Sequence, residues 1–165
     1  DLEATRLDLK AEIVEIGAIR VDSKDFSIFK EYNVKVKPRN IEIADPESLA
    51  IISYSEEEWK DAVDLRTAVE DFLRFADSTI IVANNLPFDW MWMQKAIDDL
   101  ELTPTYFFKG LDIFSLAWGK FGYGSALSTF SLKELANHFK IEMGMQHRAI
   151  EDARTAYQVF VKLMQ

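Results

Sequence analysis

The chain has 165 residues, of which 48% are hydrophobic, so it can build one core and leaves little material for a second domain. No apolar run approaches the length that crosses a bilayer, and we expect a soluble, intracellular (cytoplasmic) protein with no membrane partner. The absence of cysteine excludes disulfides and thiolate ligands, so a metal would need oxygen or nitrogen donors. The net charge of −9 disfavours tight binding of duplex nucleic acid without excluding a nuclease.

The first half of the chain predicts a hairpin, a helix and a buried strand. Residues 12–21 and 26–36 alternate apolar and polar side chains around a turn-like segment, which predicts an antiparallel hairpin. Residues 39–59 are irregular and rich in acids, Pro and Ser. Apolar residues then recur at helical spacing over 62–75, and the β-branched run 79–83 is typical of a buried strand.

The second half predicts helices and one further strand. The predicted helices are 87–100, 112–121, one that starts at the capping-box pair Ser131 and Glu134, and 147–163, and the predicted strand is 106–113. Hairpin strands followed by alternating helices and strands predict an α/β layer fold with a mixed sheet. No internal repeat or linker divides the chain.

Acidic residues near the N-terminus form a weak signal by themselves. Asp1 and Glu3 flank Leu2, and alternation along an extended segment points both carboxylates to one face, as a pair of metal ligands requires. Asp45-Pro46-Glu47 has the same spacing, so the spacing alone does not identify a site.

Two further segments carry polar residues that solubility does not require. Asp89 follows the strand 79–83, where sites in α/β folds collect, although a polar turn leading into a helix explains it equally well. His147 opens the last predicted helix, where the helix dipole disfavours the protonated imidazole, and Asp152 lies more than a turn deeper. A cap or surface role is the ordinary alternative for such a histidine, and His138 stays in that class.

Taken together, these segments resemble the DnaQ-like, DEDDh-type 3′–5′ exonuclease family. The family motifs Asp-x-Glu, Asn-x-x-Phe-Asp and His-x-Ala-x-x-Asp-Ala match DLEAT, NLPFD and HRAIEDA in order, from Asp1 to about Leu163. The resemblance implies one exonuclease domain over 1–165 with the ribonuclease H-like three-layer fold. In that fold a mixed central sheet, with an antiparallel hairpin and parallel strands, is flanked by helices.

The resemblance also implies an activity and the residues that perform it. The enzyme would hydrolyse single-stranded DNA or RNA from the 3′ end to nucleoside 5′-monophosphates, with His147 as general base. Two Mg²⁺ or Mn²⁺ ions would be held by Asp1, Glu3, Asp89 and Asp152. The residues expected to contact the terminal nucleotide are Thr5, Leu7, Asn85 and Phe88, although core packing is the favoured role for Phe88.

Several features depart from the family pattern. The family places apolar residues before the first aspartate, so we expect most of the first strand to precede Asp1 in the natural protein. Arg6 stands where glycine is common, Asn84 replaces a histidine, and 51–59 lacks a His-Gly turn. An aromatic group is explained more simply by packing than by base stacking: Trp90, Trp92, Tyr106, Phe107 and Phe108.

Two other functions stay open. A catalytically weak, exonuclease-like binding or proofreading module of a larger assembly would suit the acidic balance, with a polymerase or processing complex as partner. A ribonuclease H-like nuclease that cuts internally is the third possibility, and the histidine motif favours the exonuclease over it.

Overall fold

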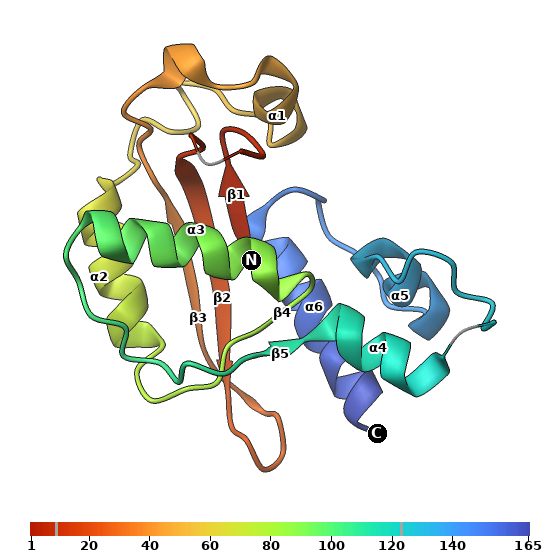
Figure 1. Ribbon diagram of the computed structural model, residues 1–165. Coiled ribbons are helices and arrows are strands. Elements are labelled where there is room, and N and C mark those ends of the chain that lie inside the picture. The colour runs from red at the N-terminus through yellow and green to blue at the C-terminus, as the bar shows by residue number, and fades with distance from the viewer. Residues whose placement is uncertain (9, 123) are drawn as a thin grey trace.

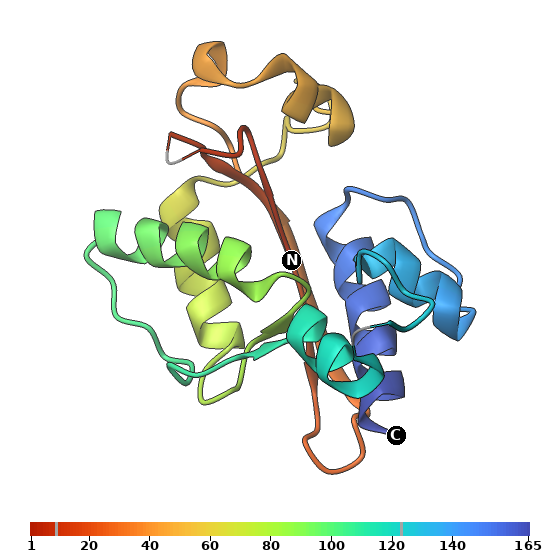
Figure 2. The ribbon, with the colours of Figure 1, turned by 45° about the vertical axis from the view of Figure 1, so that its right-hand side comes forward.

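Helices cover a central sheet from two sides in the computed structural model, which describes residues 1–8, 10–122 and 124–165 (Figure 1). The elements in chain order are β1 (Leu2–Ala4), β2 (Ile13–Val21), β3 (Ile28–Lys35), the 3₁₀ helix η1 (Ile41–Ile43), α1 (Pro46–Ile51), α2 (Leu65–Phe75), β4 (Val82–Ala83), α3 (Leu86–Asp99), β5 (Leu111–Asp112), α4 (Ile113–Phe121), α5 (Leu132–Phe139) and α6 (Ala149–Met164). Figure 2 shows α2 and α3 on one side of the sheet and α4, α5 and α6 on the other. This three-layer arrangement confirms the predicted α/β fold class.

The predicted hairpin is confirmed as the antiparallel pair β2–β3. β1 extends the sheet on the other edge of β2, where Glu3 lies directly opposite Glu15. Asp1 continues this pairing, because its backbone exchanges hydrogen bonds of 2.9 and 3.0 Å with Gly17. Register between β1 and β2 therefore places Asp1 and Glu3 on the same face of the sheet.

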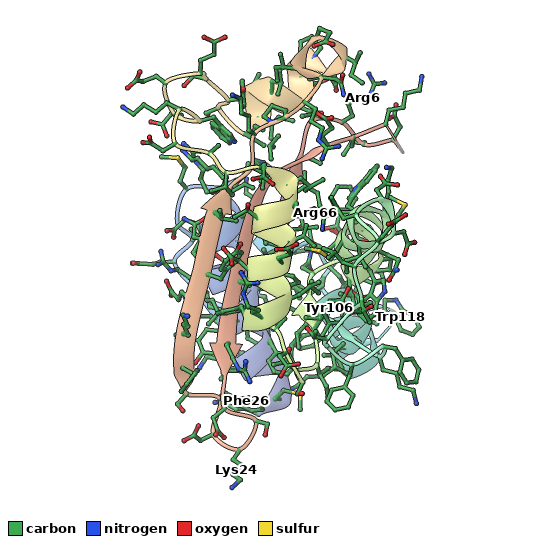
Figure 3. All side chains as sticks on the ribbon, turned by 90° about the vertical axis from the view of Figure 1, so that its left-hand side faces the viewer. Arg6, Lys24, Phe26, Arg66, Tyr106 and Trp118 are labelled. Atoms are coloured by element: carbon green, nitrogen blue, oxygen red, sulfur yellow. The ribbon has the colours of Figure 1, made fainter. Side chains whose placement is uncertain are left out.

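The two ends of the hairpin sheet are tied to different helices. Figure 3 shows Lys24 and Phe26 at the tip of the hairpin and Arg6 at the opposite end, near α1. The Phe26 ring meets the Phe160 ring of α6 edge-on, with centroids 5.5 Å apart. Arg6 donates to the Ile43 carbonyl at 2.6 Å, so this departure from the family pattern joins the loop after β1 to η1.

The parallel strands are shorter than predicted. β4 and β5 pair over two residues each, whereas the sequence predicted strands at 79–83 and 106–113. Single backbone hydrogen bonds hold the preceding residues, such as the 2.9 Å bond from Phe107 to Thr79. Within the described residues, hydrogen bonds form two separate sheets, β1–β2–β3 and β4–β5, and a cavity of about 720 Å³ is lined by residues of both.

Capping side chains set where the middle helices begin. Asp64 accepts from the Thr67 amide, so α2 starts at Leu65, three residues later than predicted. Ser131 accepts from the Glu134 amide at 3.2 Å, which confirms the predicted start of α5. In the part of the chain that the structure describes, no helix is both long and apolar enough to cross a membrane.

Two predictions about helices were wrong. Within 39–59, predicted to be irregular, η1 and α1 form, and α1 begins at Pro46 behind the capping carboxylate of Asp45. The last helix begins at Ala149 rather than at His147, because His147 has a left-handed backbone with φ of +60° that a helix cannot include.

Aromatic residues that the sequence assigned to packing divide into two groups. Trp92 and Tyr106 are buried in the core between the sheet, α2 and α3, and Trp90 packs against that core. Phe107 and Phe108 are 56% and 80% exposed, so the packing interpretation was wrong for these two.

Candidate active site

A row of charged residues crosses the sheet where the N-terminal end of α6 covers it. Glu3 on β1, Glu15 on β2 and Lys35 on β3 are direct cross-strand partners, and such partners share one face. α6 touches this sheet closely, because a methyl group on Gly17 would lie 2.2 Å from the Ala149 carbonyl carbon. The close approach brings the residues around the start of α6 to the charged row.

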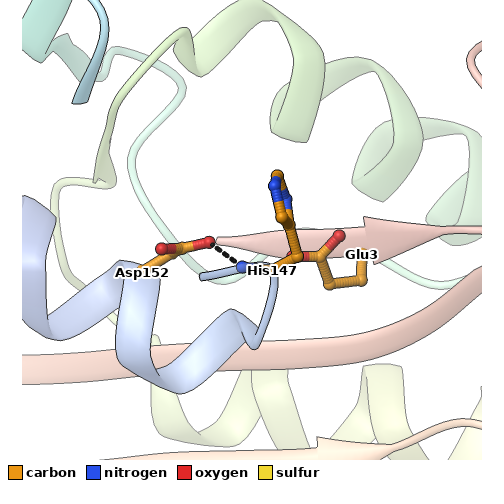
Figure 4. A group of neighbouring side chains, drawn as sticks. All are labelled: Glu3, His147 and Asp152. Carbon is orange, nitrogen blue, oxygen red and sulfur yellow. Dashed lines mark hydrogen bonds between the residues drawn. The ribbon is translucent and has the colours of Figure 1, made fainter. Parts of the chain in front are cut away.

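Three potential ligands meet at this junction. Glu3, His147 and Asp152 each offer one ligand atom, and these atoms lie within 4.8 Å of one another (Figure 4). The His147 backbone N–H donates to Asp152 Oδ2 at 2.9 Å. His147 therefore lies just before the helix rather than in its first turn, where the sequence had placed it.

Asp1 and Asp89 lie beside this cluster and, among the described residues, do not join it. Asp89 sits in the first turn of α3, is 9% exposed, and its Oδ1 has no hydrogen-bond partner among the described residues. Both residues line the cavity between the two sheets. The charge of Asp89 reaches Glu3, because it contributes to raising the pKa of Glu3.

Burial makes these acids hard to ionise. Burial, followed by repulsion from Asp152, Glu15 and Asp89, raises the pKa of Glu3 from 4.5 to about 8, against the attraction of the N-terminal ammonium. Burial also raises the pKa of Asp89 and of Asp152, the latter despite the hydrogen bond and charge of His147. A divalent cation would stabilise carboxylates that repel one another in this way. The carboxylate oxygens of this set fit Mg²⁺ or Mn²⁺, which prefer oxygen ligands.

The residues predicted to hold the terminal nucleotide are dispersed around the site. Thr5 is 1% exposed, and its hydroxyl accepts from the Glu12 amide at 3.0 Å, so it serves the chain's own backbone. Leu7 is 80% exposed. Asn85 is exposed immediately before α3, with a φ of +62°, and Phe88 packs partly against the core. Contact of these residues with a nucleotide stays a prediction.

Glu15 and Arg148 received no role from the sequence. Glu15 is only 2% exposed, and its Oε2 lies 4.0 Å from Arg148 Nη1. The alternating sequence placed Glu15 only within the predicted strand 12–21. A signal was available in an acid placed among the apolar residues of IVEIGAI, but nothing in the sequence identified a partner 133 positions away.

Comparison with known proteins finds similarity to exonucleases and to DNA polymerase III proteins. The family model RNase_T, described as exonuclease, matches residues 1–160. The PolC-type DNA polymerase III of Thermotoga petrophila is 29% identical over 170 residues, which cover 100% of this chain and 12% of the polymerase. The epsilon subunit of DNA polymerase III from Rickettsia prowazekii is 33% identical over 172 residues, covering 99% of this chain and 71% of the subunit.

Solved structures share the fold at low sequence identity. Exonuclease I has a TM-score of 0.83 and 18% identity, over 99% of this chain and 39% of its own. The nuclease domain of 3′hExo, a DEDDh family member bound to rAMP, has a TM-score of 0.83 and 13% identity, over 100% of this chain and 89% of its own. These likenesses confirm the ribonuclease H-like fold predicted from the sequence.

Proposed function

The chain belongs to the RNase_T exonuclease family, of the DnaQ-like type, and from that premise we propose that it is a metal-dependent 3′–5′ exonuclease acting on single-stranded nucleic acid. It would release nucleoside 5′-monophosphates. The observation that carries the proposal is the meeting of Glu3, His147 and Asp152 within 4.8 Å, where β1 and α6 come together. These residues supply the carboxylates and the proton acceptor that phosphodiester hydrolysis needs.

Glu3 and Asp152 would hold divalent cations directly, and Asp1 and Asp89 would complete a site for two Mg²⁺ or Mn²⁺ ions. Bound there, the cations would neutralise charge on the scissile phosphate and favour ionisation of the attacking water. The chain contributes a rigid frame for these ligands, because Glu3 lies in a paired strand and Asp152 accepts from the His147 N–H. Such preorganisation spares the protein the free energy of gathering mutually repelling acids during the reaction.

His147 would act as the general base. Its side chain is exposed beside Glu3 and Asp152, so water and substrate can reach the imidazole. The imidazole would accept a proton from the water that attacks the terminal phosphorus. The bond from phosphorus to the 3′ oxygen of the penultimate nucleotide would break, that oxygen would take a proton from solvent to become a 3′-hydroxyl, and the phosphate would stay on the 5′ oxygen of the released nucleotide.

The relatives suggest a setting for this activity. Because PolC-type polymerases and epsilon subunits are among them, we propose that the chain trims DNA 3′ ends in company with a polymerase. The net charge of −9 fits a protein that depends on a partner to bring the nucleic acid to it.

The test is a time course with a 3′-labelled single-stranded oligomer, run on matched DNA and RNA. With Mg²⁺ or Mn²⁺ we expect labelled mononucleotide as the first product, and none when EDTA removes the metal. Early fragments longer than one nucleotide would instead indicate internal cleavage. Lack of release from every substrate would favour a binding module.

A pair of histidine variants assigns the base. His147→Ala is expected to slow release about 100-fold or more, as loss of a general base does. His138→Ala is the matched control, because His138 lies in α5 with its ring 4.9 Å from that of Phe121, and it should leave the rate unchanged. Equal rates for the two variants would exclude His147 as the base.

A further inference from the structure

Arg148, the residue after His147, is enclosed by side chains from other parts of the chain. Its Nη1 lies 4.0 Å from Glu15 Oε2, and its Nη2 lies 3.5 Å from Glu58 Oε2. The guanidinium carbon lies 5.6 Å from the centroid of the Trp59 ring. Glu15, Glu58 and Trp59, together with Arg148, are called the Arg148 clamp below. Its contacts combine ion pairing with stacking on an aromatic face, which the planar guanidinium of arginine permits.

The clamp is fixed to the sheet rather than free on the surface. Trp59 is 4% exposed, and its Nε1 donates to the Val14 carbonyl at 2.9 Å. Lys35 Nζ lies 2.7 Å from Glu58 Oε2 and 4.4 Å above the Trp59 ring. Glu15 is itself a residue of β2. Arg148 is therefore anchored to β2 and β3 through each of its partners.

The Glu15–Arg148 contact pairs two buried charged atoms. Among the described residues, neither Glu15 Oε2 nor Arg148 Nη1 has a hydrogen-bond partner. These two atoms lie 4.0 Å apart, while the other terminal nitrogen of Arg148, Nη2, lies 3.5 Å from Glu58 Oε2. A buried charge left without its partner is strongly destabilising, so removal of either residue is expected to displace the other.

His147 needs such an anchor because its backbone is strained. A φ of +60° is sparsely populated for a residue with a side chain, and it persists only where surrounding contacts impose it. Asp152 holds the His147 N–H on one side, at 2.9 Å. On the other side Arg148 occupies the N-cap position of α6, where, within the described chain, its side chain makes no capping hydrogen bond. The clamp is the contact that fixes this side.

We propose that Glu15 and Arg148 are positioning residues that hold the His147 backbone in its left-handed conformation, so that the imidazole faces Glu3 and Asp152. The catalytic consequence rests on the proposed function, whereas the effect on the His147 backbone does not. Neither residue needs to touch substrate or metal. The pair acts by joining the loop that carries His147 to the same strand that lies opposite Glu3.

The first measurement is steady-state kinetics of Arg148→Met, which keeps the apolar stem and removes the guanidinium. We expect kcat to fall about 10- to 100-fold with KM changed less than about threefold, because a misplaced catalytic group slows turnover more than binding. Arg154→Met is the matched control. Arg154 lies six residues further along α6 and pairs with Glu31 Oε2 and Glu151 Oε1, both at 2.5 Å, so its loss removes an arginine and its ion pairs without touching the Arg148 clamp.

A double variant separates a shared role from two independent ones. Glu15→Gln keeps the size of the side chain and removes its charge, and we expect a loss of kcat similar to that of Arg148→Met. The double variant Glu15→Gln, Arg148→Met should be no slower than the slower single variant, because both changes release the same loop. If the loss of kcat in the double variant equalled the product of the two single losses, the proposed joint role of Glu15 and Arg148 would be overturned.

The second measurement does not depend on activity. Hydrogen exchange of the His147 amide reports its bond to Asp152, and it should be about tenfold faster or more in Arg148→Met and unchanged in Arg154→Met. Amides of β2 and β3 serve as the reference for intact folding. Wild-type exchange at His147 in Arg148→Met would overturn the proposal whatever the kinetics. Absence of turnover in the wild type would reject the nuclease function, while the exchange comparison would still decide the positioning role.

Discussion

Acids at two helix N-termini in this protein behave in opposite ways. At α5, Glu134 accepts hydrogen bonds from the amides and hydroxyls of Ser128 and Thr129, and these bonds lower its pKa from 4.5 to about 2. At α6, Asp152 accepts from the His147 amide, and burial raises its pKa and that of the neighbouring Glu3. The first acid is stabilised as an anion and the second pair is not.

Below, Glu134 is called the structural acid, because it supports the fold, and Glu3 and Asp152 are called the site acids, because they belong to the candidate active site. The donors of Glu134 are neighbours in sequence, so the folded chain alone stabilises its charge, and the carboxylate in turn holds the turn before α5. Glu3 and Asp152 are partly buried side by side, have few hydrogen-bond donors around them, and repel each other. A bound cation would supply the positive charge that stabilises these carboxylates as anions. The N-terminal end of α6, and not that of α5, is therefore the candidate metal site.

Removal of one site acid should have the largest effect. Asp152→Asn keeps an oxygen that can accept from His147 and removes the charge, so we expect release of mononucleotide to fall about a thousandfold, equivalent to about 4 kcal/mol of transition-state stabilisation. Glu134→Gln, which alters the structural acid, should stay within about twofold of the wild type because it is remote from the site. A release rate for Asp152→Asn within tenfold of the wild type would contradict the contrast.

Displacement of α6 should have the second-largest effect. Gly17→Ala places a methyl group 2.2 Å from the Ala149 carbonyl carbon, a backbone atom that cannot move alone. We expect a loss of about 1–3 kcal/mol in the free energy of unfolding by urea, together with slower nucleotide release. The matched control is Gly119→Ala in α4, where the added methyl would meet no described atom within 4 Å apart from its chain neighbours and the helix's own backbone, and it should stabilise the helix by up to about 1 kcal/mol. Equal stability of the two variants would show that α6 does not press on β2.

The two regions should also respond to pH in opposite directions. In metal-free buffer, folded Glu3 keeps its proton up to about pH 8, whereas the unfolded chain loses it near 4.5. The native state therefore binds more protons in this window, and stability should fall as pH rises from about 4.5 to about 8. Glu3→Gln should flatten this part of a plot of Tm against pH. If the slope of Tm against pH in Glu3→Gln equalled that of the wild type, Glu3 would not be the cause of this pH dependence.

Loss of the structural acid should have the smallest effect. Because the pKa of Glu134 is lowered from 4.5 to about 2, its contribution is complete above 4.5 and lost as pH falls toward 2. Glu134→Gln should therefore lower Tm by roughly 1–3 °C near neutral pH and leave Tm unchanged at about pH 2. A Tm difference that grew on acidification would contradict the assignment.

The sequence was a good guide where structure depends on neighbours along the chain. Alternation predicted β2 and β3 closely, and the Ser131–Glu134 pair predicted the start of α5, because both signals are local. The same kind of signal preceded α1 as Asp45 followed by Pro46, and reading those residues as irregular chain overlooked an ordinary helix start.

The sequence was a poor guide where structure depends on distant partners. The short β4 and β5 reflect how little of each strand finds a partner, which no composition reveals. For the site, the motifs identified Glu3, His147 and Asp152 and these converge, but the left-handed backbone of His147 arises from contacts of Arg148 with β2 and its neighbours. Tertiary contacts of this kind override local helix signals.

The most direct test of the metal site is thermal unfolding with and without Mn²⁺. At a free Mn²⁺ concentration about 100 times its Kd, binding adds about 2.7 kcal/mol and should raise the Tm of the wild type by roughly 5–10 °C. The same rise is expected in Glu134→Gln, and it should vanish in Asp152→Asn. An equal rise in Asp152→Asn and the wild type would contradict a cation site at the junction of β1 and α6.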